Sequence, residues 1–243
     1  MTCYDLKNLR RLRVLLPQSI RPLAWRALRF IPSSLKHQDE IAYWRHQWAS
    51  GNFHNDYYRR TMLAMAGETD DSFLRGKIVA DFGCGPQGSL SWATVARLRI
   101  GIDVLADTYS EFDIRSHDMV YVSSTERSIP LPSNFVDIMY TMNSIDHVSK
   151  LRVMCDEIRR TIVPGGKFFG SFNMWEPATF SEPQTLTEEN LHNVLLKHLD
   201  VQFYKIGAPG PVGDVYRPCH EGEYIDKPVP HAHLWVRATK PVS

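Results

Sequence analysis

The sequence contains one stretch, Gly76 to Leu90, that joins an apolar segment to a run of closely spaced glycines. Residues 77–82 alternate around β-branched side chains and are typical of a short buried strand, and residues 89–98 have helical spacing. Between them stand three glycines, Gly83, Gly85 and Gly88. Such turns line ligand sites at the carboxyl end of parallel sheets, because the ligand approaches the backbone closely. The stretch therefore predicts a strand, a ligand-binding turn and a helix.

Two cofactors suit this turn. The spacing Gly83-x-Gly85-x-x-Gly88 satisfies the dinucleotide fingerprint, and Asp103 lies near the distance expected for an acid that binds the ribose of NAD. Alternatively, the segment Asp81-Phe-Gly-Cys-Gly-Pro resembles the first motif of class I methyltransferases, which use S-adenosylmethionine (SAM). A carboxylate at the end of the second strand suits either cofactor, because it can accept both ribose hydroxyls.

Four further segments resemble the same methyltransferase family, in the order in which the family has them. They are Gly101-Ile-Asp, Ile129-Pro-Leu-Pro through Phe135-Val-Asp, Ile145-Asp-His-Val and Ile162-Val-Pro-Gly-Gly. The resemblance covers residues 76–173 and implies a SAM-dependent methyltransferase. The cofactor-binding residues that it implies are Asp81, Gly83, Cys84, Gly85, Asp103, Val104, Thr125, Glu126 and Asn143.

The expected adenine side of the site departs from the family. Many members carry an acid after the third strand that receives the adenine amino group, whereas this chain has Ser123-Ser-Thr-Glu there. Glu126 is the candidate substitute.

The alternation of strands and helices predicts an α/β fold. We expect a Rossmann-like, seven-stranded sheet with helices on both faces. The last strand should be antiparallel, because no helix separates it from the sixth. The predicted strands are 77–82, 99–104, 119–122, 134–142, 167–172, 201–206 and 233–238, with helices at 151–162 and 187–199 among others.

The amino-terminal region differs in charge from the rest of the chain. Residues 1–36 carry eight Lys or Arg against Asp5 alone, although the whole chain has a net charge of only +1. Their apolar spacing predicts two short basic amphipathic helices, which suit either a cap over the domain or a peripheral membrane contact. Aromatic residues recur from residue 43 onward, and the resemblance to the methyltransferase family, whose amino-terminal helices shape the substrate pocket, implies that some of Tyr43, Tyr57 and Tyr58 face the substrate.

We therefore expect an N-terminal helical cap, residues 1–70, and a SAM-binding methyltransferase domain, residues 71–243. The Gly- and Pro-rich connection at about 207–230 is longer than usual for two neighbouring strands and predicts a lid, a substrate loop or a contact between subunits of a homodimer.

His147 is the candidate catalytic residue. It follows the fourth strand at the same sheet edge as the glycine turn, and imidazole suits a general base. A structural histidine is the alternative interpretation, and His220, His231 and His233 are weaker candidates. No ligand spacing for a metal is found.

The expected reaction moves a methyl group to O, N or C of a small-molecule or glycan-like acceptor. The alternatives are a SAM-binding protein without methyl transfer, or a methyltransferase whose lipid or macromolecular substrate docks on the basic helices. The sequence has no stretch of aromatic residues interleaved with basic ones, so it gives no indication of nucleic-acid binding. The four scattered cysteines, and the lack of a signal-peptide core or membrane span in the sequence, favour a cytoplasmic protein.

Overall fold

The computed structural model describes residues 33–242, and the chain divides into two compact units, residues 1–53 and 54–243. In the first unit, helix α3 (Ser33–Ala49) contains the predicted aromatic stripe. Its residues Trp44 and Trp48 pack edge-on against Phe53, with ring centroids 6.2 and 4.9 Å apart. The two basic helices predicted before residue 32 lie outside the described residues.

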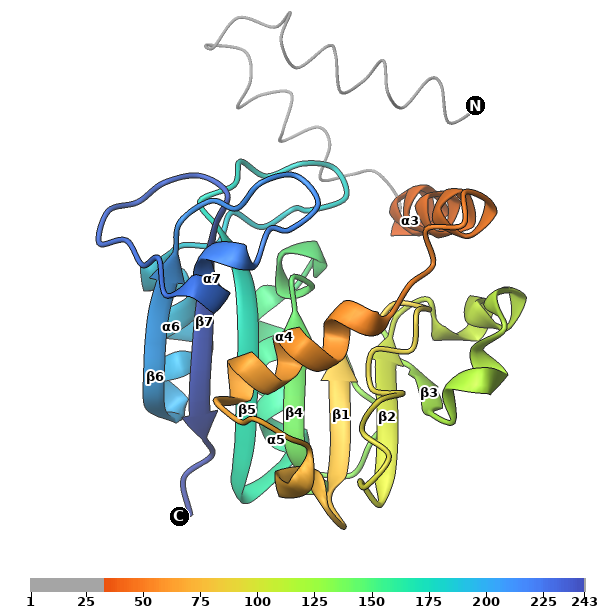
Figure 1. The fold of residues 1–243 in the computed structure, drawn as a ribbon, viewed down its shortest axis with the longest axis horizontal. Coiled ribbons are helices and arrows are strands. Elements are labelled where there is room, and N and C mark those ends of the chain that lie inside the picture. The colour runs from red at the N-terminus through yellow and green to blue at the C-terminus, as the bar shows by residue number, and fades with distance from the viewer. Residues whose placement is uncertain (1–32, 243) are drawn as a thin grey trace, which may run out of the picture. The chain divides into compact units, whose positions relative to one another are not determined.

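The second unit is built on a seven-stranded sheet in the order β3-β2-β1-β4-β5-β7-β6 (Figure 1). Every pairing is parallel except those of β7, which runs antiparallel to both β5 and β6. This confirms the predicted Rossmann-like sheet with an antiparallel last strand. The strands are β1 (Ile78–Phe82), β2 (Leu98–Asp103), β3 (Val120–Ser123), β4 (Val136–Met142), β5 (Ile162–Met174), β6 (Asp200–Gly207) and β7 (Ala232–Thr239).

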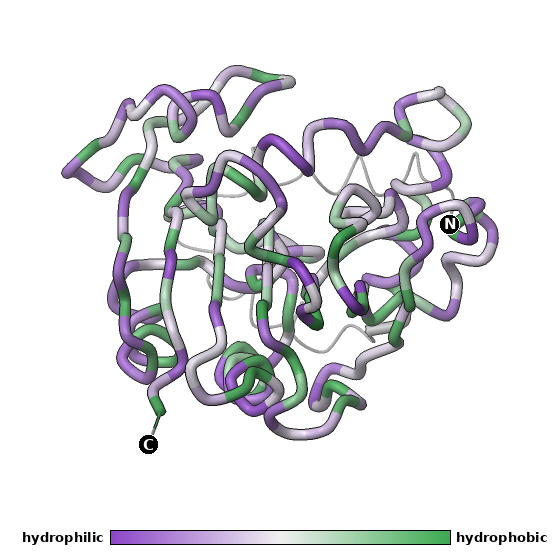
Figure 2. Tube along the Cα trace, turned by 60° about the horizontal axis from the view of Figure 1, so that its bottom comes forward, coloured by the Kyte–Doolittle hydropathy of each residue, from purple (hydrophilic) through white to green (hydrophobic). Residues whose placement is uncertain are grey.

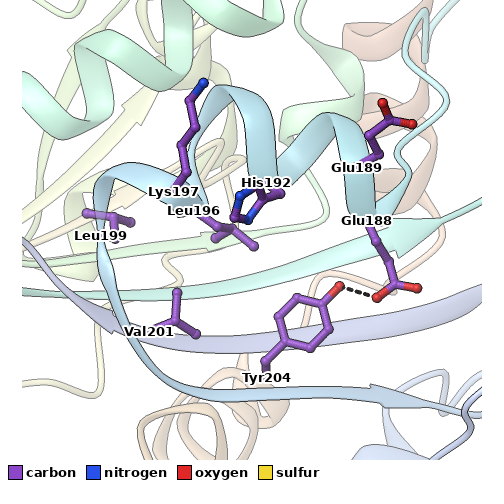
Figure 3. Close-up of a pocket in the computed structure, with 8 residues that line it drawn as sticks. All are labelled: Glu188, Glu189, His192, Leu196, Lys197, Leu199, Val201 and Tyr204. Carbon is purple, nitrogen blue, oxygen red and sulfur yellow. Dashed lines mark hydrogen bonds between the residues drawn. The ribbon is translucent and has the colours of Figure 1, made fainter.

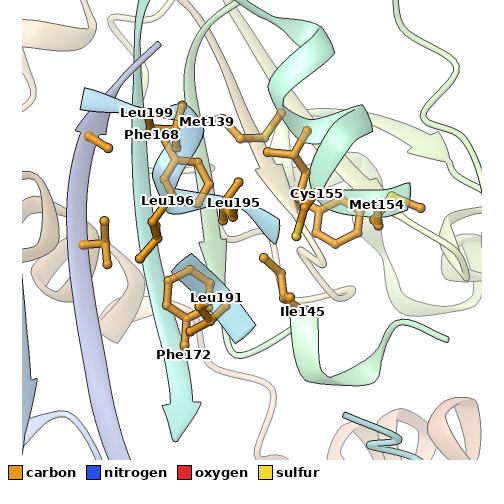
Figure 4. Close-up of a cluster of buried hydrophobic side chains, with 14 of the residues drawn as sticks. Met139, Ile145, Met154, Cys155, Phe168, Phe172, Leu191, Leu195, Leu196 and Leu199 are labelled. Atoms are coloured by element: carbon orange, nitrogen blue, oxygen red, sulfur yellow. The ribbon is translucent and has the colours of Figure 1, made fainter. Parts of the chain in front are cut away.

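Helices cover both faces of the sheet. Helices α5 (Leu151–Thr161) and α6 (Glu188–Val194) lie on one face, and α4 (Asp56–Ala66) crosses the other (Figure 1). Between α5, α6 and the sheet lies the larger core, whose labelled side chains in Figure 4 are Met139, Ile145, Met154, Cys155, Phe168, Phe172, Leu191, Leu195, Leu196 and Leu199. In Figure 2, hydrophobic residues recur along these strands and helices, and hydrophilic residues dominate the outer loops.

The helix expected at residues 89–98 does not form, and residues 89–97 make a series of turns. Side chains bond to the backbone here, since Trp92 Nε1 donates to the Ser89 carbonyl and Arg99 Nη1 to the Ser91 carbonyl, both at 2.9 Å. Leu90 and Ala93 are nevertheless buried in the same cluster as residues of α4. The apolar pattern was interpreted correctly as a core face, but the prediction of helical backbone was wrong.

The helix expected at 187–199 is shorter than predicted. Thr187 opens α6 as predicted, and its side chain accepts from Asn190 N while the Asn190 side chain accepts from Thr187 N. The helix ends at Val194, and a 3-10 turn, η5 (Leu196–His198), follows. The break at Leu195 lets three further leucines enter the core, Leu195, Leu196 and Leu199.

Short 3-10 turns replace helices in the remaining connections. They are η1 (Ser72–Leu74), η2 (Ala106–Phe112), η3 (Ile114–His117) and η4 (Ile145–His147). The long connection between β6 and β7 contains one short helix, α7 (Arg217–Glu221), and a bridge from Tyr224 back to Gly207.

Candidate functional site

The glycine turn follows β1 directly, and all three of its glycines have positive φ, 74° at Gly83, 58° at Gly85 and 75° at Gly88. At Gly83 there is also no room for a side chain, because a Cβ would collide with the side chain of Ser144. Ser144 Oγ donates to the Phe82 carbonyl at 2.8 Å, so the loop after β4 is fastened to the end of β1. Glycine is thus needed here for the packing of two loops as well as for the backbone turn.

Asp81 lies inside the end of β1 and is 1% exposed. Its Oδ2 accepts from Ser89 Oγ at 2.5 Å, whereas Oδ1 has no hydrogen-bond partner. Burial, only partly offset by the hydrogen bond from Ser89, raises the pKa of Asp81 to about 7. A buried carboxylate oxygen without a partner is costly, so this atom marks a position where a cationic or hydrogen-bonding group would be stabilised.

Asp103 ends β2, as predicted, and is buried. Its two oxygens accept backbone hydrogen bonds, Oδ2 from Gly85 N at 3.1 Å and Oδ1 from Leu105 N at 2.9 Å. Burial raises its pKa, and these bonds oppose the rise. The Tyr109 side chain also hydrogen-bonds to Asp103, and since each carboxylate oxygen has two lone pairs, the group keeps acceptor capacity beside these three bonds. The structure therefore ties the ribose candidate directly to the glycine turn.

Cys84 faces the protein and not the open side of the turn. A Cβ at Gly101 would lie 2.7 Å from Cys84 Sγ, so the thiol fills the space left by that glycine of β2. Burial raises the pKa of the thiol well above its ordinary value. Val104 follows Asp103 in a half-buried turn that leads into η2.

Thr125 and Glu126, the candidates for the adenine side, make different contacts. Thr125 Oγ1 closes a turn by accepting from the backbone N–H of Arg127 and Ser128 at 3.1 and 3.0 Å. Glu126 Oε2 accepts from Ser149 N at 3.1 Å, which holds the β3–β4 connection against the segment that precedes α5.

The segment after β4 brings two predicted residues, Asn143 and His147, to the same sheet edge. Asn143 has a φ of 47°, and its N–H donates to the Ser171 carbonyl of β5 at 2.9 Å. His147 ends η4, and its Nε2 lies 3.9 Å from Glu182 Oε1. His147 also interacts electrostatically with Asp103, so the catalytic candidate lies close to the ribose candidate.

Asp146, which the sequence reasoning did not select, is the most buried charged group of this segment at 4% exposure. Its Oδ1 has no hydrogen-bond partner, and burial raises its pKa. Asp146 lies inside the Ile145-Asp-His-Val segment, but its burial has no signature in the sequence.

Tyr216, from the long β6–β7 connection, was also missed. Its hydroxyl bonds to Ser171, and its ring packs edge-on against His233 with centroids 5.2 Å apart. It interacts electrostatically with Tyr57 of α4 and with Asp146. The connection predicted as a lid or substrate loop therefore reaches the carboxyl edge of β4 and β5.

Of the three weaker histidine candidates, His233 adjoins Tyr216, whereas His220 and His231 have other partners. His220 packs against Trp235, with centroids 5.2 Å apart, and His231 Nδ1 lies 3.0 Å from Glu176 Oε1. His233 is buried, and desolvation lowers its pKa to about 4, so it is neutral at physiological pH.

A groove on the outer edge of the sheet is separate from this site (Figure 3). Strand order places β6 beyond β4, β5 and β7 as seen from β1, so the groove is remote from the glycine turn. Its lining residues are Glu188, Glu189, His192, Leu196, Lys197, Leu199, Val201 and Tyr204.

Within residues 33–242, no three His, Cys, Asp or Glu side chains are grouped so that they could hold a metal ion. A search of the same residues for a helix long and apolar enough to span a bilayer found none.

Comparison with known proteins agrees with this geometry. Residues 80–170 match the family model of a methyltransferase domain. A Haloferax volcanii chain, solved with the Trm112 methyltransferase activator, shares the fold at 16% identity and a TM-score of 0.56, covering 81% of this chain and 96% of that one. A SAM-dependent methyltransferase of Thermotoga maritima shares the fold at 15% identity and a TM-score of 0.56, covering 84% of this chain and 97% of that one. The [4+2]-cyclase SpnF shares the fold at 18% identity and a TM-score of 0.52, covering 76% of this chain and 82% of that one. No curated protein matches the chain.

Residues 80–170 thus correspond to a methyltransferase domain, and the sheet order and the glycine turn support a SAM-dependent methyltransferase with a Rossmann-like fold. The protein is accordingly an enzyme, and its cofactor is S-adenosylmethionine.

Proposed function

We propose that this enzyme transfers the methyl group of SAM to oxygen, nitrogen or carbon of a small-molecule or glycan-like acceptor. The observation that carries the proposal is the convergence of the glycine turn, Asp103 and His147 at the carboxyl edge of three adjacent parallel strands, β1, β2 and β4. Ligands of open α/β sheets bind at this edge.

The residues at this edge fit SAM. Asp103 would accept the ribose hydroxyls. The backbone N–H groups of the turn suit the carboxylate of the methionine part of the cofactor. The unpartnered Oδ1 of Asp81 suits the ammonium group, because a cation beside a buried carboxylate offsets the cost of its charge. Cys84 and Gly83 shape the turn. The other residues proposed to contact the cofactor are Val104, Thr125, Glu126 and Asn143.

Bound SAM supplies a methyl group already activated by a sulfonium. The protein must hold the acceptor atom in line behind that methyl and exclude water, and orientation of this kind contributes roughly 7–11 kcal/mol. Tyr57, Tyr58 and Tyr216 offer aromatic walls for this purpose. His147 would remove a proton from an acceptor hydroxyl or ammonium group.

Titration calorimetry with S-adenosylhomocysteine tests the cofactor site. The wild type should bind it, Gly85→Arg should abolish binding, and Asp103→Ala should weaken it by about 1.5–3 kcal/mol, since a charge-assisted contact is lost. Asp107→Ala removes an exposed carboxylate four residues away and is the matched control. Binding of NAD instead, sensitive to the same changes, would overturn the assignment.

Three kinds of partner are proposed besides the acceptor: a second protein, a second copy of this chain and a membrane surface. The Haloferax chain in complex with an activator protein supports the proposal that a protein partner exists for this fold. The homodimer and the membrane contact of residues 1–36 stay predictions.

A further inference from the structure

The glycine turn is contacted from the β2–β3 connection by His117, the last residue of η3. The His117 ring lies directly against Gly88, because a Cβ at Gly88 would stand 2.6 Å from His117 Cγ. Gly88 also has a φ of 75°, so a side chain at this position would strain the backbone and displace the ring. The third glycine of the turn is therefore required by its contact with His117 as well as by its conformation.

Tyr121 of β3 joins His117 to the backbone of Gly88. Its hydroxyl lies 2.7 Å from His117 Nδ1, and it also forms a hydrogen bond with the Gly88 backbone. Burial raises the pKa of Tyr121 and lowers the pKa of His117, so the phenol keeps its proton and the imidazole is neutral. Since a backbone N–H can only donate, the Tyr121 oxygen accepts from Gly88 and its proton goes to His117 Nδ1. The three groups form one hydrogen-bond relay.

The position of the Tyr121 ring is set by the sheet and not by the turn. A Cβ at Gly101 of β2 would stand 3.2 Å from Tyr121 Cδ1, so the ring lies against the backbone of the neighbouring strand. It also packs edge-on against Tyr109, a fully buried residue, with ring centroids 6.1 Å apart. A ring fixed in this way presents its hydroxyl to the turn at a fixed place.

The Gly88 end of the turn bears on one half of the proposed cofactor site. Gly88 is followed by Ser89, which is fully buried and whose Oγ donates to Asp81 Oδ2 at 2.5 Å. The other oxygen of Asp81 is the one proposed to receive the ammonium group of SAM. Asp103, the ribose candidate, is bonded instead to Gly85. A change at Gly88 therefore acts on the amino-acid half of the site.

We propose that Tyr121 and His117 are positioning residues for the glycine turn. They fix its Gly88–Ser89 end and thereby align Asp81 for the ammonium group of SAM. This inference rests on the cofactor site proposed above. Tyr121→Phe would keep the ring and its packing but leave the Gly88 N–H without its acceptor, so the turn would lose one fixed point.

Two ligands separate the two halves of the site. S-adenosylhomocysteine has an adenosine and an amino-acid part, whereas 5′-methylthioadenosine has the adenosine and the sulfur but no amino acid. In calorimetry with the full chain, Tyr121→Phe should weaken S-adenosylhomocysteine binding about three- to tenfold, the effect of one hydrogen bond, and leave 5′-methylthioadenosine binding unchanged. Asp81→Asn should show the same selectivity. Tyr204→Phe, which removes the hydroxyl bonded to Glu188 on the edge strand β6, should change neither affinity.

His117→Ala gives the same test from the other end of the relay and serves where Tyr121→Phe fails to fold. It should also weaken S-adenosylhomocysteine binding alone, and the double variant should bind no worse than the weaker single one, because both changes remove the same fixed point. Equal weakening of both ligands, unchanged S-adenosylhomocysteine affinity in folded Tyr121→Phe, or no binding of 5′-methylthioadenosine to the wild type at millimolar concentration would each overturn the inference. Failure of the wild type to bind S-adenosylhomocysteine would instead refute the cofactor site.

Discussion

Replacement of Asp81 by Asn should make the protein more stable at alkaline pH and not at acidic pH. Burial holds the pKa of Asp81 at about 7 in the folded protein, against 3.8 for a free side chain. Between these two values the folded state keeps a proton that the unfolded state releases, so wild-type stability falls as pH rises. Each pH unit in that window costs about 1.4 kcal/mol. From pH 5 to pH 8 the wild type should therefore lose about 3 kcal/mol relative to Asp81→Asn.

The asparagine keeps the oxygen that accepts from Ser89 Oγ, so the variant removes the charge and little else. Urea unfolding without cofactor, followed by circular dichroism at several pH values, gives the difference in unfolding free energy between the two proteins. Asp107→Asn, at an exposed position, should show a difference that does not change with pH. If the difference between Asp81→Asn and wild type is also constant from pH 5 to pH 8, Asp81 is not a buried acid of raised pKa and the reasoning fails.

Three further results are expected. Gly83→Ala should lower the unfolding free energy by more than Gly76→Ala in urea titrations, because both glycines have φ near 70° but only the first would collide with Ser144; equal losses would contradict the packing argument. If His147 is a general base, His147→Ala should lower turnover about 100- to 10,000-fold with S-adenosylhomocysteine affinity nearly unchanged; a structural histidine would instead lower the melting temperature, and turnover only with the folded fraction. If residues 1–36 form a cap, deleting them should weaken cofactor binding or stability, and the intact chain should not sediment with anionic vesicles; salt-sensitive sedimentation that the deletion abolishes would support a membrane contact.

The fold was predictable because its signals are local. Five of the seven strands are short apolar runs bounded by turn residues, and each was placed within one residue of its observed ends. β5 was placed too short, since Pro164 and Gly165 were interpreted as a turn before the strand, whereas they form an irregular start of the strand itself. β4 was started two residues early, since Asn134 has a φ of 55° and belongs to the turn before the strand.

The candidate site was predictable only in its cofactor half. Gly85 and Asp103 stand in a recognisable order along the chain, and the structure joins them by a hydrogen bond. Asp146 and Tyr216 carry no such signal, because their importance arises from burial and from contacts between segments about 70 residues apart. A sequence pattern does not show that a carboxylate is buried with an oxygen that has no hydrogen-bond partner.

Residues 89–97 form turns and not the helix predicted at 89–98, and this leaves part of the sheet face to α4. A segment of this length is a marginal helix on its own, and the hydroxyls of Ser89 and Ser91 bond to other segments, Ser89 to Asp81 and Ser91 to Asn55. The Ser89 hydroxyl donates to Asp81 at the end of β1, and the segment folds as turns beside that strand. The face of the sheet that a first helix would cover is shared with α4, whose Tyr58 hydroxyl lies 3.5 Å from Gln87 Oε1 in the glycine turn. Helix α4, which precedes β1 in the chain, therefore lines the glycine turn. Its residues Tyr57 and Tyr58 lie on the side of the turn where the acceptor is proposed to bind.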